Sequence, residues 1–205
     1  FLQDSHNPDP NPSERPGRWI GETGSPTQNV SIKRYKMGPG ALFEKNCETT
    51  GFANICSPLS IGLKTGEYMP ISGSAELPQD QSADDALSVC FEDKQLTAPL
   101  DLLGTPNLYL RASSDFSCGL IAARLCDVAP DGTSTLISYG VLNLKQRNGR
   151  ETLAELTPGE NVDVVIRLND IGWSLKPQHK VRLALSSQLW PMAWPVAERA
   201  TITLD

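Results

Sequence analysis

The most constraining feature of this 205-residue chain is a succession of short, β-forming segments separated by turns in its second half. Apolar and polar residues alternate in residues 107–112, and similar segments occupy 120–125, 135–144, 162–168, 181–186 and 200–204. Alternation buries one face of each strand, so two sheets must close on each other. Turn signals such as Pro130 and Asp131-Gly132 separate the segments, and Gly140 is expected at a bulge or bend. The pattern predicts an all-β fold, an antiparallel β-sandwich.

The first half of the chain is far less regular. Closely spaced prolines in residues 7–16 prevent a sustained helix or strand, so residues 1–30 are predicted to be a linker. Phe1, Leu2 and Gln3 could form the tail of a strand that begins further upstream. Short strands are expected at 30–35 and 66–71, and one helical turn at 80–87. We therefore divide the chain into a linker, 1–30, and a β-sandwich domain, 31–205, with core strands mainly in 89–205.

Charge and hydropathy narrow the range of partners. The chain has 18 Lys and Arg against 24 Asp and Glu, a net charge of −6, so it lacks the basic surface that nucleic-acid binding requires. No apolar stretch approaches the roughly 18 residues needed to span a bilayer, and residues 1–30 are too polar for a signal peptide. We expect neither a nucleic-acid nor a membrane partner.

The five cysteines favour a reducing environment. Their number is odd and no CxxC pair occurs, which favours reduced thiols and a cytoplasmic location. Cys118 and Cys126 lie in apolar surroundings and are predicted to be small buried hydrophobic residues. Cys47 and Cys56 flank a glycine-containing loop and could be bridged in an oxidising compartment.

Catalytic motifs are hard to find in the sequence. The nucleophile-elbow pattern G-x-S-x-G does not occur, and His6 and His179 are the only histidines. His179 lies between a proline turn and a strand, where we expect it to make a backbone hydrogen bond. An independent hydrolase that pairs Ser or Cys with His179 is the least favoured hypothesis, because no third group or oxyanion donor pattern accompanies the histidine. We predict no catalytic residue in this chain.

Metal and cofactor motifs are not found either. A calcium loop beginning at Asp80 fails, because Asp85 stands where glycine is needed and Phe91 where the bidentate glutamate belongs. We therefore expect no metal and no cofactor. The acidic residues of this region are instead predicted to form a solvated loop; they are Asp80, Asp84, Asp85, Glu92 and Asp93.

Tryptophans mark two candidate binding segments. Trp19 follows a glycine turn in Arg15-Pro16-Gly17-Arg18-Trp19 and is expected to anchor the linker on a neighbouring surface. Trp190 and Trp194 each precede a proline, so their rings are expected on an irregular loop at 189–195. This loop is either an aromatic platform for sugars or, as we favour, a hydrophobic plug against the sandwich or a partner domain.

Several motifs, taken in order, resemble one known family. They are Phe91 with Pro99–Gly104 and Leu108–Leu110, the hairpin Arg124–Gly132 with its L-x-D-V-x-P-D-G pattern, and segments 140–144, 156–159 and 179–187. The Trp-Pro pairs, Arg15–Trp19, Asp80-Gln81 and Asp84–Ala86 complete the series. Together they resemble the C-terminal domain of X-prolyl dipeptidyl peptidases and cocaine esterase-like serine hydrolases, the CocE/NonD family. One departure is Gln178, where the family often has glycine before the histidine.

The resemblance implies a fold and a role. In this family an α/β-hydrolase domain with an inserted helical cap carries the Ser, Asp and His triad, and a jelly-roll domain of the galactose-binding-like type follows. The resemblance therefore implies a non-catalytic accessory domain that packs on the catalytic domain of the same protein and shapes its active-site entrance. Residues Phe1–Asp4 would be the remnant of a late strand of the catalytic domain, with the triad upstream.

Two further expectations follow from this resemblance. The interdomain candidates are Arg15, Arg18, Trp19, Trp190 and Trp194, and an exposed apolar surface around Trp19 and the 189–195 loop could also support a homo-oligomer. The alternative function is a carbohydrate-binding module, with Trp190 and Trp194 as its sugar platform.

Overall fold

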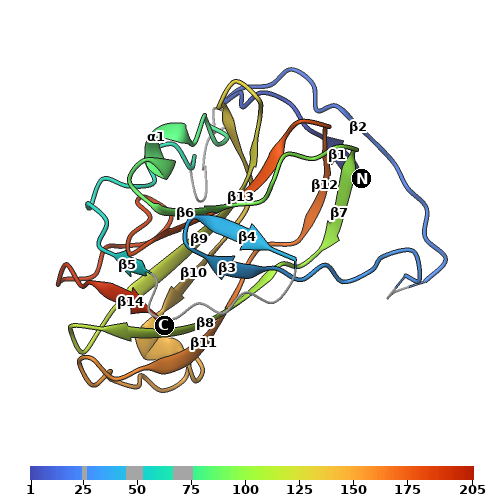
Figure 1. Cartoon of the computed structure of the whole chain (residues 1–205). Helices are drawn as coiled ribbons and strands as arrows, with labels where there is room; N and C mark the ends of the chain where they lie inside the picture. Colours follow the sequence, from blue (N-terminus) through green and yellow to red (C-terminus); the bar gives the residue numbers. More distant parts are fainter. Residues whose placement is uncertain (25–26, 45–52, 67–75) are drawn as a thin grey trace.

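The chain forms three β-sheets that share one core (Figure 1). The structure, a computed structural model, describes residues 1–24, 27–44, 53–66 and 76–205. Its only α-helix in these ranges is the four-residue α1 (Ser82–Asp85), and a 3-10 turn spans Leu144–Gln146. The all-β prediction is confirmed, and none of the described helices is long and apolar enough to cross a membrane.

The sheets are defined by their strand order. The N-terminal sheet is β2 (Gly17–Arg18), β1 (Leu2–Asp4), β12 (Ile171–Leu175) and β7 (Leu100–Gly104). The central sheet is β10 (Ser134–Asn143), β9 (Leu120–Val128), β13 (Lys180–Ser186), β6 (Val89–Glu92), β4 (Ala41–Phe43) and β3 (Lys36–Gly38). The C-terminal sheet is β11 (Val162–Arg167), β8 (Asn107–Ser114), β14 (Ile202–Leu204) and β5 (Ala53–Ile55).

Most neighbouring strands run antiparallel, as alternation predicted, with two exceptions. Strand β1 runs parallel to β12, and β4 runs parallel to β6. Strand β1 therefore pairs within the N-terminal sheet of this domain, where Gln3 lies beside Trp173. The jelly-roll connectivity implied by the resemblance stays a prediction.

One hydrophobic core unites the three sheets. It contains Phe91, Ile121 and Leu185 from the central sheet. Opposite them lie side chains of both four-stranded sheets; among these are Leu110, Val164, Ile166, Trp173, Leu175 and Ile202. The central sheet is therefore one layer of the sandwich and the two four-stranded sheets form the other.

Strand β9 is buried on both faces, which alternation alone does not predict. On the face away from the core, Leu120 and Ala122 pack against Leu189. Further along the same face, the Arg124 guanidinium lies beneath the α1 segment and contacts Gln81 and Asp85. Two segments from distant parts of the chain thus cover the outside of the central sheet.

Those contacts correct the prediction of a solvated acidic loop. Asp84, Asp85 and Asp93 are each less than 7% exposed. Asp85 forms an ion pair with Arg124, whose Nη1 lies 2.9 Å from Asp85 Oδ1, and accepts a hydrogen bond from Arg182 Nη1 at 2.7 Å, so its charge is compensated. The other two buried aspartates accept from uncharged donors, Asp84 from the Lys64 amide and Asp93 from the Tyr35 hydroxyl. These carboxylates are therefore bound within the fold and are not a solvated loop.

Local predictions had mixed outcomes. The helical turn within 80–87 is confirmed as α1. The strand predicted at 30–35 is wrong, since the first strand of this region is β3, which begins at Lys36. The strand predicted at 66–71 lies almost wholly outside the described residues, as does Cys47 and hence its pairing with Cys56.

The predicted bulge is also misplaced. The register of β10 shifts between Leu136 and Ser138, not at Gly140. Gly140 has another role, because a Cβ atom there would lie 2.6 Å from the backbone oxygen of Arg167. Glycine at this position lets β10 approach the end of β11 closely.

Candidate functional site

Arg18 and Trp19 lie at the free edge of the N-terminal sheet. The Arg18 guanidinium reaches Asp4 Oδ1 at 3.1 Å and, across β1 and β12, Asp101 Oδ2 at 2.6 Å. Asp101 in turn accepts from Ser174 Oγ at 2.6 Å. Although these ion pairs are about half exposed, they fix the direction of β2 and of the residue that follows it.

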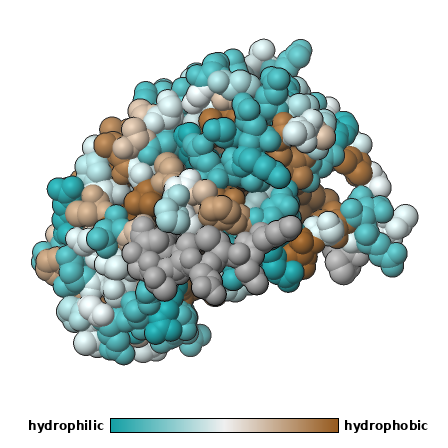
Figure 2. Space-filling view, viewed as in Figure 1, coloured by the Kyte–Doolittle hydropathy of each residue, from teal (hydrophilic) through white to brown (hydrophobic). Residues whose placement is uncertain are grey.

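Trp19 is held in place yet remains exposed. Its ring contacts the Phe1 ring edge-on at a centroid distance of 5.3 Å, but 83% of the residue is accessible to solvent. Gly17 makes this arrangement possible, because a Cβ atom there would lie 2.5 Å from both the Leu2 oxygen and the Phe1 ring. Phe1 and Ile20 are about half exposed as well. Figure 2 shows apolar surface at this end of the molecule, beside the N-terminus.

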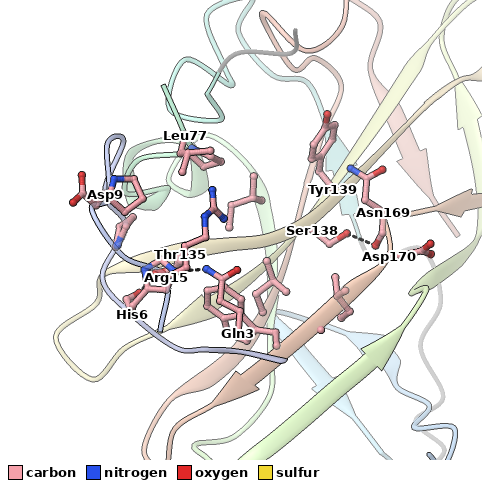
Figure 3. Close-up of a pocket in the computed structure, with 18 residues that line it drawn as sticks. Gln3, His6, Asp9, Arg15, Leu77, Thr135, Ser138, Tyr139, Asn169 and Asp170 are labelled. Carbon is pink, nitrogen blue, oxygen red and sulfur yellow. Dashed lines mark hydrogen bonds between the residues drawn. The ribbon is translucent and has the colours of Figure 1, made fainter. Parts of the chain in front are cut away.

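Arg15, predicted beside them, lines a pocket instead. The pocket has a volume of about 300 Å³ and is walled by the N-terminal segment, β10, the residues that lead into β12, and Leu77 with Pro78. Figure 3 shows Gln3, His6, Asp9 and Arg15 on one side, and Ser138, Tyr139, Asn169 and Asp170 on the other.

The 189–195 loop has a buried base and an exposed ring. Leu189 is buried against Leu120 and Ala122, so the base of the 189–195 loop is a hydrophobic plug. The Trp190 and Trp194 rings meet at 5.4 Å with an interplanar angle of 75°, and Trp194 is 81% exposed. The irregular loop is therefore confirmed, with one part packed on the sheet and one ring accessible to solvent.

The two tryptophan groups do not form one surface. Figure 1 places β2 at the upper right of the molecule and the loop between β13 and β14 at the left. The two groups therefore belong to separate parts of the fold, the edge of the N-terminal sheet and the loop between β13 and β14. Each group must be considered as a separate candidate.

A Ser, Asp and His cluster lies inside the domain, and the sequence did not predict it. Asp127 Oδ1 lies 2.7 Å from His179 Nδ1, and Asp127 Oδ2 accepts from Trp173 Nε1 at 3.0 Å and from the Ser5 hydroxyl. Ser5 Oγ also lies 3.3 Å from the same Nδ1 atom of His179. Sequence reasoning missed the cluster because Ser5, Asp127 and His179 come from three parts of the chain that are distant in sequence.

This cluster does not have the geometry of a catalytic triad. In a triad the aspartate and the nucleophile contact different ring nitrogens, so that the imidazole can pass a proton between them. Here both contact Nδ1, and Ser5 is only 2% exposed. The cluster instead satisfies the buried Asp127 carboxylate with donors from three segments, which ties β1 to β12 and β13. His179 makes the expected backbone hydrogen bonds, since its oxygen accepts from the Leu96 amide at 2.9 Å and its amide donates to the Lys176 oxygen at 3.3 Å. The contact of its imidazole with the Asp127 carboxylate was not predicted.

Two of the four described cysteines, Cys90 and Cys126, have thiols protected by burial. Cys126 is fully buried, and burial raises its pKa to about 12; burial likewise raises the pKa of Cys90 to about 11. Neither is a reactive thiolate near neutral pH. Cys126 is a buried hydrophobic residue as predicted, whereas Cys118 is only partly buried. Within the described ranges no group of His, Cys, Asp and Glu is arranged to hold a metal ion.

Comparisons with known proteins agree on one family. A family model described as "X-Pro dipeptidyl-peptidase C-terminal non-catalytic domain" matches residues 3–205. The cocaine esterase of Rhodococcus sp. (strain MB1 Bresler) is 27% identical over 120 residues, which are 58% of this chain and 21% of the esterase. The chain thus spans about a fifth of the length of this curated relative.

Solved structures show the same fold at low identity. An α-amino acid ester hydrolase matches with a TM-score of 0.73 at 19% identity, over 93% of this chain and 36% of that chain. An aminopeptidase from the marine sediment archaeon Thaumarchaeota archaeon matches with 0.70 at 19%, over 83% and 33%. A CocE/NonD family hydrolase from Staphylococcus aureus matches with 0.68 at 13%, over 97% and 38%.

Proposed function

Since the chain belongs to the family of C-terminal non-catalytic domains of X-Pro dipeptidyl-peptidases, we propose that it is an accessory domain of a serine hydrolase with ester or amide substrates. In this proposal it packs on an α/β-hydrolase domain of the same protein and shapes one wall of the active-site entrance. Residues 1–30 connect the two domains and 31–205 form the sandwich. The names of the similar solved proteins, an ester hydrolase, an aminopeptidase and a CocE/NonD family hydrolase, support this substrate class.

The observation that carries the proposal is the exposed ring of Trp19, which contacts Phe1 and follows the ion-paired Arg18. A C-terminal domain is joined to the rest of its protein through its N-terminal side, and that side is where β1 and β2 lie. Trp19 is held there by Phe1 and by the ion pairs of Arg18, so little conformational freedom is lost when a partner covers it. Rigid, exposed aromatic rings are typical of interface anchors.

The docking test uses the full-length protein and two matched substitutions. We expect Trp19→Ala to weaken the contact between the domains, so that limited proteolysis cuts the 1–30 segment faster and the hydrolase domain unfolds at a lower temperature. Trp194→Ala removes an equally exposed ring on the other side of the molecule and serves as the control. The docking proposal is wrong if Trp19→Ala changes neither readout, or if Trp194→Ala produces the larger change.

A second test addresses the absence of catalysis. The 205-residue chain alone should not turn over p-nitrophenyl esters, because Ser5 is buried and both Ser5 and Asp127 contact the same ring nitrogen of His179. Turnover that a serine-directed inhibitor abolishes, and that Ser5→Ala removes, would contradict this proposal.

The exposed ring of Trp194 favours a second candidate function, carbohydrate binding at Trp190 and Trp194. Exposed aromatic rings can stack on sugars, and the Trp190 ring supports the exposed Trp194 ring through an edge-on contact. Soluble glycans titrated while tryptophan fluorescence is recorded would test it, with Trp194→Ala as the negative control. An unchanged signal across a broad glycan panel argues against a sugar platform.

A cytoplasmic location is also part of the proposal. Its support is the four free cysteines among the described residues, Cys56, Cys90, Cys118 and Cys126. Thiol titration of protein purified from its native cells under alkylating conditions should find these residues reduced. Self-association through the apolar end near Trp19 would appear as a concentration-dependent sedimentation coefficient that Trp19→Ala reduces.

A further inference from the structure

One asparagine of this chain, Asn148, is followed directly by glycine. The pair comes after the 3-10 turn Leu144–Gln146, in the connection between β10 and β11 at the bottom of Figure 1. Both Asn148 and Gly149 are exposed. The pair is chemically distinctive, because glycine has no side chain to shield its backbone nitrogen from the asparagine amide that precedes it.

The backbone around Gly149 leaves room for a ring to close. Its φ of 138° lies in a region that L side chains rarely adopt, and no described atom lies within 4 Å of the position that a Cβ atom would take. The Gly149 amide donates to the Gln146 oxygen at 3.1 Å. This bond is at the end of an exposed turn, where local opening costs little free energy, so the nitrogen is only weakly held.

The side-chain amide of Asn148 is unusual among the exposed asparagines. Within the described residues no hydrogen bond holds it. Asn29, Asn107 and Asn161 are exposed as well, but each donates from Nδ2 to a carboxylate or carbonyl oxygen at 2.9–3.1 Å. Those three amides lose a partner when they turn towards the backbone, whereas the Asn148 amide does not.

Positive charge lies on both sides of the pair. Arg147 and Arg150 flank it in the sequence, and the Arg147 guanidinium is held in place by the oxygens of Leu144, at 3.0 Å, and Glu155, at 3.3 Å. A backbone nitrogen that loses its proton becomes an anion, and nearby cations stabilise that form. The charges around Gly149 therefore favour its nitrogen as a nucleophile.

We propose that Asn148 is a site of spontaneous deamidation, a self-modification with water as its only co-reactant. The Gly149 nitrogen loses its proton and attacks Asn148 Cγ. The new N–Cγ bond forms, the Cγ–Nδ2 bond breaks, and Nδ2 leaves as ammonia with that proton. Water then opens the resulting succinimide ring at either carbonyl, which gives aspartate or isoaspartate without any change in oxidation state.

The modification changes the connection between β10 and β11. Either product adds one negative charge next to Arg147, and isoaspartate also inserts a carbon atom into the main chain before Gly149. The connection is closed by the bond from the Ala154 amide to the Lys145 oxygen at 2.8 Å. The effect is therefore expected at this exposed end of the sandwich and not in its core.

The first test follows the purified 205-residue chain during incubation at neutral pH. Ion-exchange chromatography should show a fraction with one more negative charge, and peptide mapping should locate the change at Asn148. We expect Asn148 to react at least about tenfold faster than Asn29, Asn107 or Asn161, because each of these must first break a hydrogen bond. The rate should rise with pH, since the attacking nitrogen must lose a proton.

Asn148→Gln should abolish the acidic fraction, because glutamine would have to close a larger and less favourable ring. Asn161→Gln, which changes an exposed asparagine that is not followed by glycine, is the matched control and should leave the fraction unchanged. An acidic fraction that persists in Asn148→Gln, or another asparagine that reacts first, would overturn the proposal.

A second test asks whether the fold permits the reaction. The rate at Asn148 in the folded chain should be within about tenfold of the rate in the urea-unfolded chain, because the fold holds the nucleophile by one hydrogen bond only. If Asn148 reacts in urea but stays intact in the folded chain, the turn protects it and the proposal is wrong. Both measurements use this chain alone, so their outcome is separate from that of the proposed docking to a hydrolase domain.

Discussion

Arg124 shows at the scale of a single residue how a charge is accommodated inside this sandwich. It is fully buried, and its guanidinium contacts Asp85, Gln81 and Ser88. The sequence offered a signal, because Arg124 interrupts the apolar run of residues 120–126. The acidic partners could not be chosen from the sequence, since 39 residues separate Arg124 from Asp85 and no local pattern links them.

We expect Arg124→Met to lower the free energy of unfolding by about 3 kcal/mol, because Asp85 and Gln81 lose a buried partner. Arg167→Met is the matched control, since Arg167 also lies in a strand and pairs with an aspartate but is exposed. The control should cost less than about 1 kcal/mol. Urea unfolding of both variants measures the difference, and equal costs would mean that the buried network adds no stability.

Glu92 predicts a pH dependence. Burial raises its pKa, but the hydrogen bonds from Arg182 and Lys180 outweigh burial, so the pKa is lowered from 4.5. A lowered pKa contributes stability that is present above pH 4.5 and is lost as the pH falls through the folded-state pKa. Glu92→Gln should therefore destabilise the protein at pH 7 and make progressively less difference below pH 4.5. Urea unfolding at a series of pH values tests this; a constant difference would refute it.

Gln178 is the one departure from the family pattern, and its backbone conformation explains why the family often has glycine at this position. Its φ of 70° lies in the left-handed region that favours glycine. We expect Gln178→Gly to raise the free energy of unfolding by about 0.5–1 kcal/mol, since relief of the strain exceeds the added freedom of the unfolded chain. Gln95→Gly, at a position without a positive φ, should be destabilising. If both variants behave alike in thermal unfolding, the backbone argument fails.

At the scale of elements, the strands with clear alternation were the ones that the sequence predicted. Strands β8, β11 and β13 fall where periodicity placed them, and β9, β10 and β14 overlap the other β-forming segments that were predicted. Strand β12 was missed because Gly172 breaks its pattern, and glycine is needed there since a Cβ atom would lie 2.7 Å from the Phe1 oxygen. The partners of the short strand β1 could not be foreseen, because three residues carry too little pattern to specify a register.

The sequence predicted the irregular 189–195 loop, but not which of its residues is buried and which is exposed. Leu189 is 1% exposed and covers β9, so Leu189→Ala should lower the free energy of unfolding by about 2–4 kcal/mol. Trp194→Ala should change it by less than about 0.5 kcal/mol, because the ring is mostly solvated. Chemical denaturation distinguishes them. A larger loss for Trp194→Ala would show that the exposed ring, not the buried leucine, holds the loop.

At the scale of the whole molecule, the alternation indicated a sandwich, but not that three sheets would share it. The central sheet packs on both four-stranded sheets through one core. We therefore expect the chain to unfold as one cooperative unit. Calorimetry should show one transition, coincident with the loss of near- and far-ultraviolet circular dichroism. Two separated transitions would mean that the N-terminal sheet is an independent unit.

The parallel pairing of β1 with β12 has a mechanical consequence. A force that pulls the N-terminal end along its strand axis loads the β1–β12 hydrogen bonds together, in shear, instead of opening them one after another. The Ser5 hydroxyl, bound to Asp127, and the Arg18 bridge to Asp101 resist displacement in the same place. Strand β1 is thus fixed to the sandwich by several contacts at once. A domain joined to this end of the chain would keep a defined orientation relative to the sandwich.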